Sequence, residues 1–245
     1  YDTLKADGIG LITSYEDRYL GDAVFAPVWE ELNRRNAVVY THPSWPACCS
    51  KMRDELNVST VEYATDTTRT IGSIVLSGTA ARYPNIRWIF SHGGGTLPFL
   101  AARIAHAADR NPAFAGKNPR GVEYELKRLY CDTASAESAP QMAAMLQFFP
   151  ETHILYGSDA PFLPPHHSVE ELDKIALSMP VRDGRLTIKT RNTLLGKMTD
   201  EVAGLVLRNN YLQTLALSLA QKRGLEDLGF QQRLMQSLEA QGELD

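Results

Sequence analysis

Four apolar, β-rich runs of the sequence each end on a histidine or an aspartate. The runs are VVYTHP with His42, IRWIFSHGGG with His92, RLYCDTA with Asp132 and ILYGSDAPF with Asp159. Buried strands that stop at such residues are typical of the carboxyl rim of a (β/α) barrel, where enzymes of that fold have their active sites. The pattern therefore predicts an α/β enzyme whose site lies at this rim.

Between and around these runs, the sequence alternates between strand-like and helix-like stretches. Strands are predicted over residues 8–14, 38–43, 86–92, 127–134 and 153–160. Helices are predicted over residues 27–37, 61–82, 97–110, 137–149, 168–179, 186–196 and 199–222. This gives about five strand–helix units, whereas a closed barrel has eight. We expect a (β/α)8 TIM-barrel type that lacks its N-terminal βα units, with the barrel domain over 1–223 and a polar tail over 224–245.

Charge and composition exclude several other classes of protein. The net charge is −4 with both signs interspersed, which gives no electrostatic reason to expect nucleic acid or an anionic membrane as partner. The longest apolar stretches are far shorter than the roughly 20 residues of a membrane-spanning helix. Three cysteines without a disulfide framework favour a reducing compartment, so we expect a cytoplasmic protein. Adjacent Cys48 and Cys49 are expected to be reduced loop cysteines.

His42 and Asp159 are candidate metal ligands. Pro43 stops the strand directly after His42, and a neutral imidazole at that point is well placed to bind a divalent metal. Asp159 follows the last clear strand, where a buried carboxylate needs a metal or a cation beside it. The structural alternatives are a strand-end histidine that bonds a loop carbonyl and an aspartate that caps a turn.

His92, Asp132 and Arg103 complete the set of candidate site residues. His92 precedes three glycines, which allow the backbone to approach a ligand, and its imidazole is able to shuttle a proton. For Asp132, a structural role and a catalytic role are equally well supported. Arg103 lies on the predicted helix after the glycines, where it is either a bidentate clamp for a substrate carboxylate or an ordinary solvated arginine.

Taken in order, THP, SHGGGTLPFLAAR, LYCDTA and ILYGSDAPF resemble the motifs of the amidohydrolase-related decarboxylases, over roughly residues 1–215. This family groups the relatives of aminocarboxymuconate semialdehyde, γ-resorcylate and 6-methylsalicylate decarboxylases. The opening stretch YDTLKADGIGLITSY looks most like the fungal 6-methylsalicylate type. The resemblance implies a metal-dependent lyase that removes CO2 from a small hydroxylated aromatic acid.

The resemblance also implies roles for individual residues. His42 and Asp159 would hold a divalent metal, with zinc placed ahead of manganese. Asp159 and His92 would be catalytic, the first as proton donor and the second as an aid to the substrate or to metal-bound water. Arg103 matches an arginine that grips the substrate carboxylate, in some members from the neighbouring subunit. A homodimer or larger homo-oligomer is therefore expected.

One departure from the family pattern affects these expectations. The family's first strand carries an HxH or ExH pair that supplies two further ligands, and no such pair precedes His42. A catalytic metal site normally takes three protein ligands, so we expect weakened metal binding and interpret the chain as a C-terminal portion of the enzyme. Two alternatives remain: a metal-dependent hydrolase of a lactone or amide, and a metal-free remnant that only binds or oligomerises. Arg103 favours decarboxylation over hydrolysis, because a neutral lactone needs no carboxylate clamp.

Overall fold

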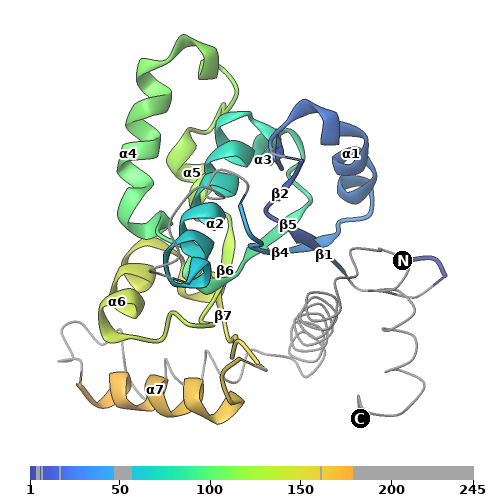
Figure 1. Cartoon of the computed structure of the whole chain (residues 1–245). Helices are drawn as coiled ribbons and strands as arrows, with labels where there is room; N and C mark the ends of the chain where they lie inside the picture. Colours follow the sequence, from blue (N-terminus) through green and yellow to red (C-terminus); the bar gives the residue numbers. More distant parts are fainter. Residues whose placement is uncertain (4–5, 7, 17, 47–56, 161, 179–245) are drawn as a thin grey trace.

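The computed structural model describes residues 1–3, 6, 8–16, 18–46, 57–160 and 162–178, and its centre is a parallel sheet (Figure 1). The strands are β1 (Gly8–Ile12), β4 (Val38–His42), β5 (Arg87–Phe90), β6 (Tyr130–Asp132) and β7 (Ile154–Leu155). They lie side by side in chain order, and every pairing between them is parallel. Successive βα units of a barrel produce this order, so the predicted partial barrel is confirmed.

Helices connect each strand of the sheet to the next one, and α7 follows the last strand (Figure 1). They are α1 (Ala26–Arg34), α2 (Val58–Leu76), α3 (Thr79–Arg82), α4 (Leu97–Arg110), α5 (Val122–Lys127), α6 (Ala139–Phe148) and α7 (Pro165–Ser178). A small antiparallel hairpin of β2 (Ser14–Tyr15) and β3 (Arg18–Tyr19) follows β1. In the part of the chain that the structure describes, no helix is long and apolar enough to cross a membrane.

The elements predicted within the described residues are present, with corrections at their ends. The predicted helix over 61–82 is two helices, because Gly78 adopts a φ of 80° between α2 and α3. The last predicted strand shortens to the two residues of β7. The β2–β3 hairpin and α5 were not predicted. Residues 179–245, with two predicted helices and the predicted domain boundary at 223, lie outside the described residues, as do Cys48 and Cys49.

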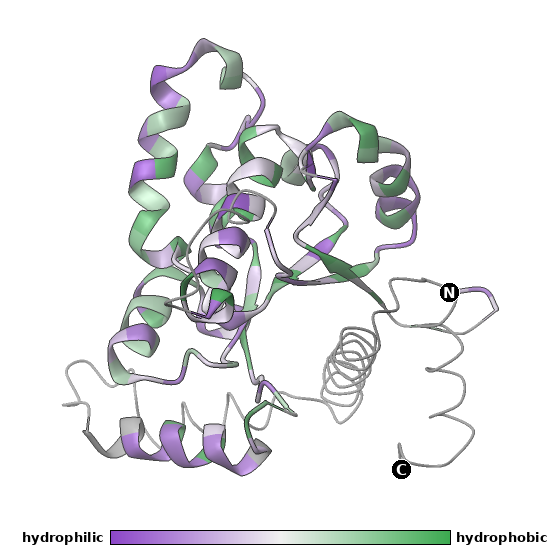
Figure 2. Ribbon diagram, viewed as in Figure 1, coloured by the Kyte–Doolittle hydropathy of each residue, from purple (hydrophilic) through white to green (hydrophobic). Residues whose placement is uncertain are grey.

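The core forms where the helices cover the sheet. Trp29 of α1 meets Trp88 of β5 edge to face, with 5.0 Å between the ring centroids. The Trp29 indole N–H also donates to the Leu20 carbonyl at 3.1 Å, so its one polar atom is satisfied inside the core. Figure 2 shows apolar residues along the central strands and mostly polar ones along α7. The apolar core thus fixes the strands whose ends carry the candidate site.

Buried hydrogen bonds join α2 to the end of β1. Asp66 of α2 is fully buried and accepts from the hydroxyls of Thr13 and Tyr19, the second at 2.7 Å. The Thr70 hydroxyl of α2 donates back to the Thr13 carbonyl. A buried carboxylate satisfied in this way is costly to disturb, which fixes α2 over the carboxyl edge of the sheet.

The three glycines after β5 allow the chain to pass close to α2. Gly93, Gly94 and Gly95 all have positive φ, at 67°, 72° and 67°. A Cβ atom on Gly95 would lie 2.1 Å from the Ala64 carbonyl oxygen of α2. Only glycine adopts this backbone and leaves this space empty. The triple glycine therefore decides how closely the loop after β5 approaches α2.

We expect Gly95→Ala to lower the free energy of unfolding by several kcal/mol or to prevent folding, since a backbone carbonyl has to move. The matched control is Gly116→Ala, where φ is +71° and nothing lies within 4 Å of the added Cβ. That control should cost about 1 kcal/mol, from φ alone. Urea denaturation of both variants measures the difference, and equal losses would contradict the contact with Ala64.

Candidate metal centre and active site

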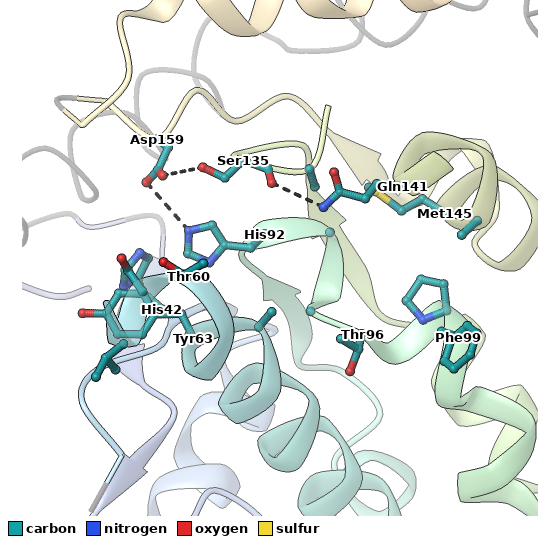
Figure 3. A pocket seen from close by; sticks show the side chains of 18 of the residues that line it. His42, Thr60, Tyr63, His92, Thr96, Phe99, Ser135, Gln141, Met145 and Asp159 are labelled. Carbon is teal, nitrogen blue, oxygen red and sulfur yellow. Dashed lines mark hydrogen bonds and ion pairs between the residues drawn. The ribbon is translucent and has the colours of Figure 1, made fainter. Parts of the chain in front are cut away.

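Three of the predicted site residues meet at the carboxyl edge of the sheet (Figure 3). His42 is the last residue of β4, His92 opens the 3₁₀ turn η3 (His92–Gly94) after β5, and Asp159 follows β7. One ligand atom from each residue lies within 4.8 Å of the other two. The imidazole rings of His42 and His92 are 5.0 Å apart, centroid to centroid. The cluster therefore includes both predicted metal ligands and the predicted catalytic histidine.

His42 is held in the form that binds metals. Its Nδ1 lies 2.8 Å from the Pro43 carbonyl oxygen, which accepts the Nδ1 proton and leaves Nε2 with a free lone pair. Burial, helped by the neighbouring His92, lowers the pKa of His42 to about 4. The imidazole is therefore neutral near pH 7, as metal binding requires.

His92 and Asp159 form a charge pair at the centre of the cluster. His92 Nε2 lies 3.7 Å from Asp159 Oδ1, and the Ser135 hydroxyl donates to Asp159 Oδ2 at 2.7 Å. Burial on its own lowers the pKa of His92, but Asp159 and the charge of Asp132 outweigh it and raise the pKa. Burial likewise tends to raise the pKa of Asp159, yet His92 and Ser135 lower it overall. The proton of this pair thus resides on His92.

The backbone at the cluster adopts conformations that side chains seldom allow. His92, Ser135 and Asp159 have φ values of 56°, 49° and 58°, in the left-handed region. Such conformations are uncommon outside glycine and concentrate at functional sites, where surrounding contacts hold them. Ser135 was not singled out from the sequence, although its position just after a predicted rim strand was an available signal.

Asp132 lies at the end of β6 and is fully buried. Its Oδ2 accepts from the Tyr40 hydroxyl at 2.8 Å, and its Oδ1 accepts from the backbone N–H groups of His92 and Ala134 at 2.9 and 3.1 Å. Burial raises the pKa of Asp132 to about 6. These hydrogen bonds go to Tyr40 and to two backbone N–H groups, and Asp132 is not among the residues that line the cavity. The structural role is therefore favoured over the catalytic one.

A cavity of about 900 Å³ opens above the cluster. Its walls come in part from the first two turns of α2, α4 and α6, with side chains that include Tyr63, Phe99, Gln141 and Met145 (Figure 3). Cavities of this size hold small-molecule ligands, and aromatic walls suit a flat ring. The described lining residues include no lysine or arginine, so its charges are those of the cluster.

The structure does not bring Arg103 into this cavity. Arg103 is exposed on α4, four residues beyond Phe99, which lines the cavity mouth and is 88% exposed. Residues four apart share one face of a helix, so Arg103 and Phe99 project from the same side of α4. The predicted carboxylate clamp therefore lies beside the mouth of the cavity and is not one of its described lining residues.

The model of the amidohydrolase family matches residues 2–210. Among curated relatives, decarboxylase macB of Penicillium terrestre is 38% identical over 182 residues, which cover 71% of this chain and 52% of macB. The 6-methylsalicylic acid decarboxylase of Penicillium expansum is 35% identical over 164 residues, which cover 66% of this chain and 51% of that enzyme. The chain thus spans about half the length of the curated relatives it matches.

Solved structures share the fold. An amidohydrolase II structure superposes with a TM-score of 0.65 and 27% identity, covering 80% of this chain and 63% of the other. A dihydroxybenzoic acid decarboxylase from Polaromonas, crystallised with manganese and 2-nitroresorcinol, gives a TM-score of 0.62 at 20% identity and covers 80% of this chain and 62% of its own. At that identity, the second likeness concerns the fold alone.

A shorter likeness is of a different kind. Over 72 residues, or 29% of this chain, the sequence is 57% identical to an NAD-specific glutamate dehydrogenase of Pseudomonas aeruginosa. The matched segment makes up only 4% of that dehydrogenase. It therefore carries no dehydrogenase activity over to this chain.

The pKa of His42 predicts a pH-dependent stability of the metal-free chain. The folded value of about 4 lies below the ordinary 6.5, so the unfolded chain binds this proton more readily between these values. Stability is therefore lost as the pH falls through this window. Relative to a His42→Gln variant, we expect the wild-type free energy of unfolding to fall by on the order of 3 kcal/mol.

Urea denaturation of both proteins over a series of pH values measures this effect. Asp132 titrates in both proteins, so its contribution cancels from the difference. A difference that stays constant from pH 6.5 to pH 4 would contradict the buried, neutral state of His42.

Proposed function

The chain belongs to the amidohydrolase family, and on that premise we propose that it serves the metal-dependent, non-oxidative decarboxylation of a hydroxylated aromatic acid of the 6-methylsalicylate type. One observation carries the proposal: two imidazoles and a carboxylate converge at the base of a cavity with aromatic walls. The matched 6-methylsalicylic acid decarboxylase of Penicillium expansum supports this choice of substrate class.

The donor set of the cluster fits a divalent metal. Imidazole nitrogen and carboxylate oxygen suit zinc and manganese alike, and His42 already presents an unprotonated Nε2. We assign His42 and Asp159 as ligands and place zinc ahead of manganese, although the Polaromonas decarboxylase of this fold holds manganese. When bound, the metal would act as a Lewis acid that stabilises negative charge on substrate oxygen atoms.

The pair of His92 and Asp159 would deliver the proton that the reaction consumes. In the metal-free chain the pKa directions favour His92 as its carrier and Asp159 as the counter-ion, whereas the resemblance implied Asp159 as the donor and His92 as its aid. The proton adds to the ring carbon that bears the carboxylate. The bond to the carboxylate then breaks, its electron pair returns to the ring, and CO2 leaves. Ser135 keeps the Asp159 carboxylate oriented during these steps.

The cavity walls would hold the ring, but the substrate carboxylate needs further positive charge. The described lining residues contribute no lysine or arginine. Arg103 is exposed beside the cavity mouth on α4 and remains available to a second copy of the chain. We therefore assign Arg103 to the substrate carboxylate in a neighbouring subunit, within a homodimer or larger homo-oligomer.

Incubation with 6-methylsalicylate and zinc or manganese, with CO2 release as the readout, tests the activity. His42→Ala should lose both bound metal and turnover, because a ligand is removed. His92→Ala should keep its metal and lose about 100-fold or more in kcat, because the proton carrier is removed. His166→Ala, which changes an exposed histidine of α7, is the matched control and should behave as wild type.

Other outcomes would overturn parts of the proposal. Loss of metal in His92→Ala would make His92 a third ligand. Hydrolysis of a dicarboxylate lactone without CO2 release would favour a hydrolase. A chain that binds no metal and turns over neither substrate would support a non-catalytic role.

Arg103 is tested by complementation between subunits. Arg103→Met should raise KM for the aromatic acid by tenfold or more, the approximate value of a charge-assisted hydrogen bond, whereas Arg110→Met on the same helix should not. Oligomers that mix Arg103→Met and His92→Ala chains should regain part of the wild-type activity, because one site then holds both native residues. Mixed oligomers with no more activity than the average of their two parents would argue against a contribution across subunits.

A further inference from the structure

We propose that Asp132 is a positioning residue for the metal centre, which fixes the ends of three strands and thereby the side chains that would bind the ion and carry the proton. This inference rests on the proposed function of the same site. It is carried by contacts of Asp132 with β4, with the loop after β5 and with the loop after β7.

The first contact fixes the end of β4. The Tyr40 hydroxyl donates to Asp132 Oδ2 at 2.8 Å, and both side chains are buried. Tyr40 and His42 are two residues apart in one strand, so their side chains project from the same face of the sheet. The hydrogen bond to Tyr40 therefore restrains the end of β4 and, with it, the direction in which the His42 side chain points.

The second contact fixes His92 itself. Its backbone N–H donates to Asp132 Oδ1 at 2.9 Å, while its φ of 56° is unfavourable for a residue with a side chain. Such a conformation persists only when the surroundings enforce it. The Ala134 N–H, at 3.1 Å from the same oxygen, completes a small backbone nest around the carboxylate.

The third contact is with the loop after β7, which leads to Asp159. Gly157 packs so closely on Asp132 that a Cβ atom there would lie 2.9 Å from the Asp132 Cγ. The Thr133 hydroxyl accepts from the Gly157 N–H at 3.1 Å and donates to the Gly157 carbonyl at 3.2 Å. These contacts hold the loop after β7 against the end of β6. Asp159 follows Gly157 by two residues in this loop.

The environment of Asp132 is a costly one for a carboxylate. The carboxylate is fully buried, and the structure describes no lysine or arginine within 4.0 Å of it. A buried carboxylate is costly even when hydrogen-bonded, and an apolar side chain fills such a space at a lower cost. The three chain segments that the carboxylate joins account for an acidic side chain at this position.

Metal affinity, measured by competition with a chelator, tests the proposal without any substrate. Asp132→Ala should lower the affinity for zinc by about 10- to 100-fold, the usual effect of losing a partner behind the ligands. Asp132→Asn keeps an oxygen that accepts from the two N–H groups, so its zinc affinity should stay close to that of the wild type. Tyr40→Phe removes one contact of Asp132. Its zinc affinity should lie between those of Asp132→Asn and Asp132→Ala.

Glu125→Ala is the matched control, because it truncates another buried carboxylate, which pairs with Arg128 away from the cavity. The control should lower the free energy of unfolding and leave zinc affinity unchanged. If Asp132→Ala behaves in the same way, with wild-type affinity in the folded fraction, Asp132 serves stability alone and the proposal is wrong.

A second readout needs no metal. In metal-free protein, Asp132→Ala should shift the imidazole NMR resonances of His42 and His92, whereas Glu125→Ala should not. Unchanged resonances in Asp132→Ala would also overturn the proposal. A wild-type chain that binds zinc and releases no CO2 would refute the proposed function and leave the role of Asp132 intact.

Discussion

The five strands of the main sheet all run in the same direction, and this pairing decides where the chemistry lies. Parallel strands bring all their carboxyl ends to one edge, so His42, His92 and Asp159 become neighbours despite their separation along the chain. Antiparallel pairing would send alternate strand ends to opposite edges and separate these residues. The helices that return the chain between strands then have their first turns beside the cluster, where they form the walls of the cavity.

Local sequence patterns predicted the parts of the fold that depend on burial. The apolar runs located all five strands, and the residues that ended three of them, His42, His92 and Asp159, form the cluster. The hairpin of β2 and β3 escaped prediction because strands of two residues have no measurable periodicity. The role of Arg103 stays a prediction, because its side chain is exposed on α4 and a single chain does not show what a neighbouring subunit would bring to it.

The electrostatics of the site depend on tertiary contacts that no local pattern encodes. His42 and His92 both follow apolar strands, yet burial lowers the pKa of one while carboxylates raise that of the other. The carboxylate of Asp132 and the hydroxyl of Tyr40 are 92 residues apart in sequence, and their bond appears only in the assembled sheet. The bond between Ser135 and Asp159, 24 residues apart in sequence, likewise appears only in the folded chain.

The triple glycine has a consequence for how such a site diverges between related proteins. Gly93, Gly94 and Gly95 have no side chain to vary, each has a positive φ, and the third lies against the backbone of α2. Point mutation therefore has little access to the base of the cavity. Changes in the shape of the cavity are more readily accommodated on the surrounding helices and loops, at positions such as Gln141 and Phe162, than at the glycines.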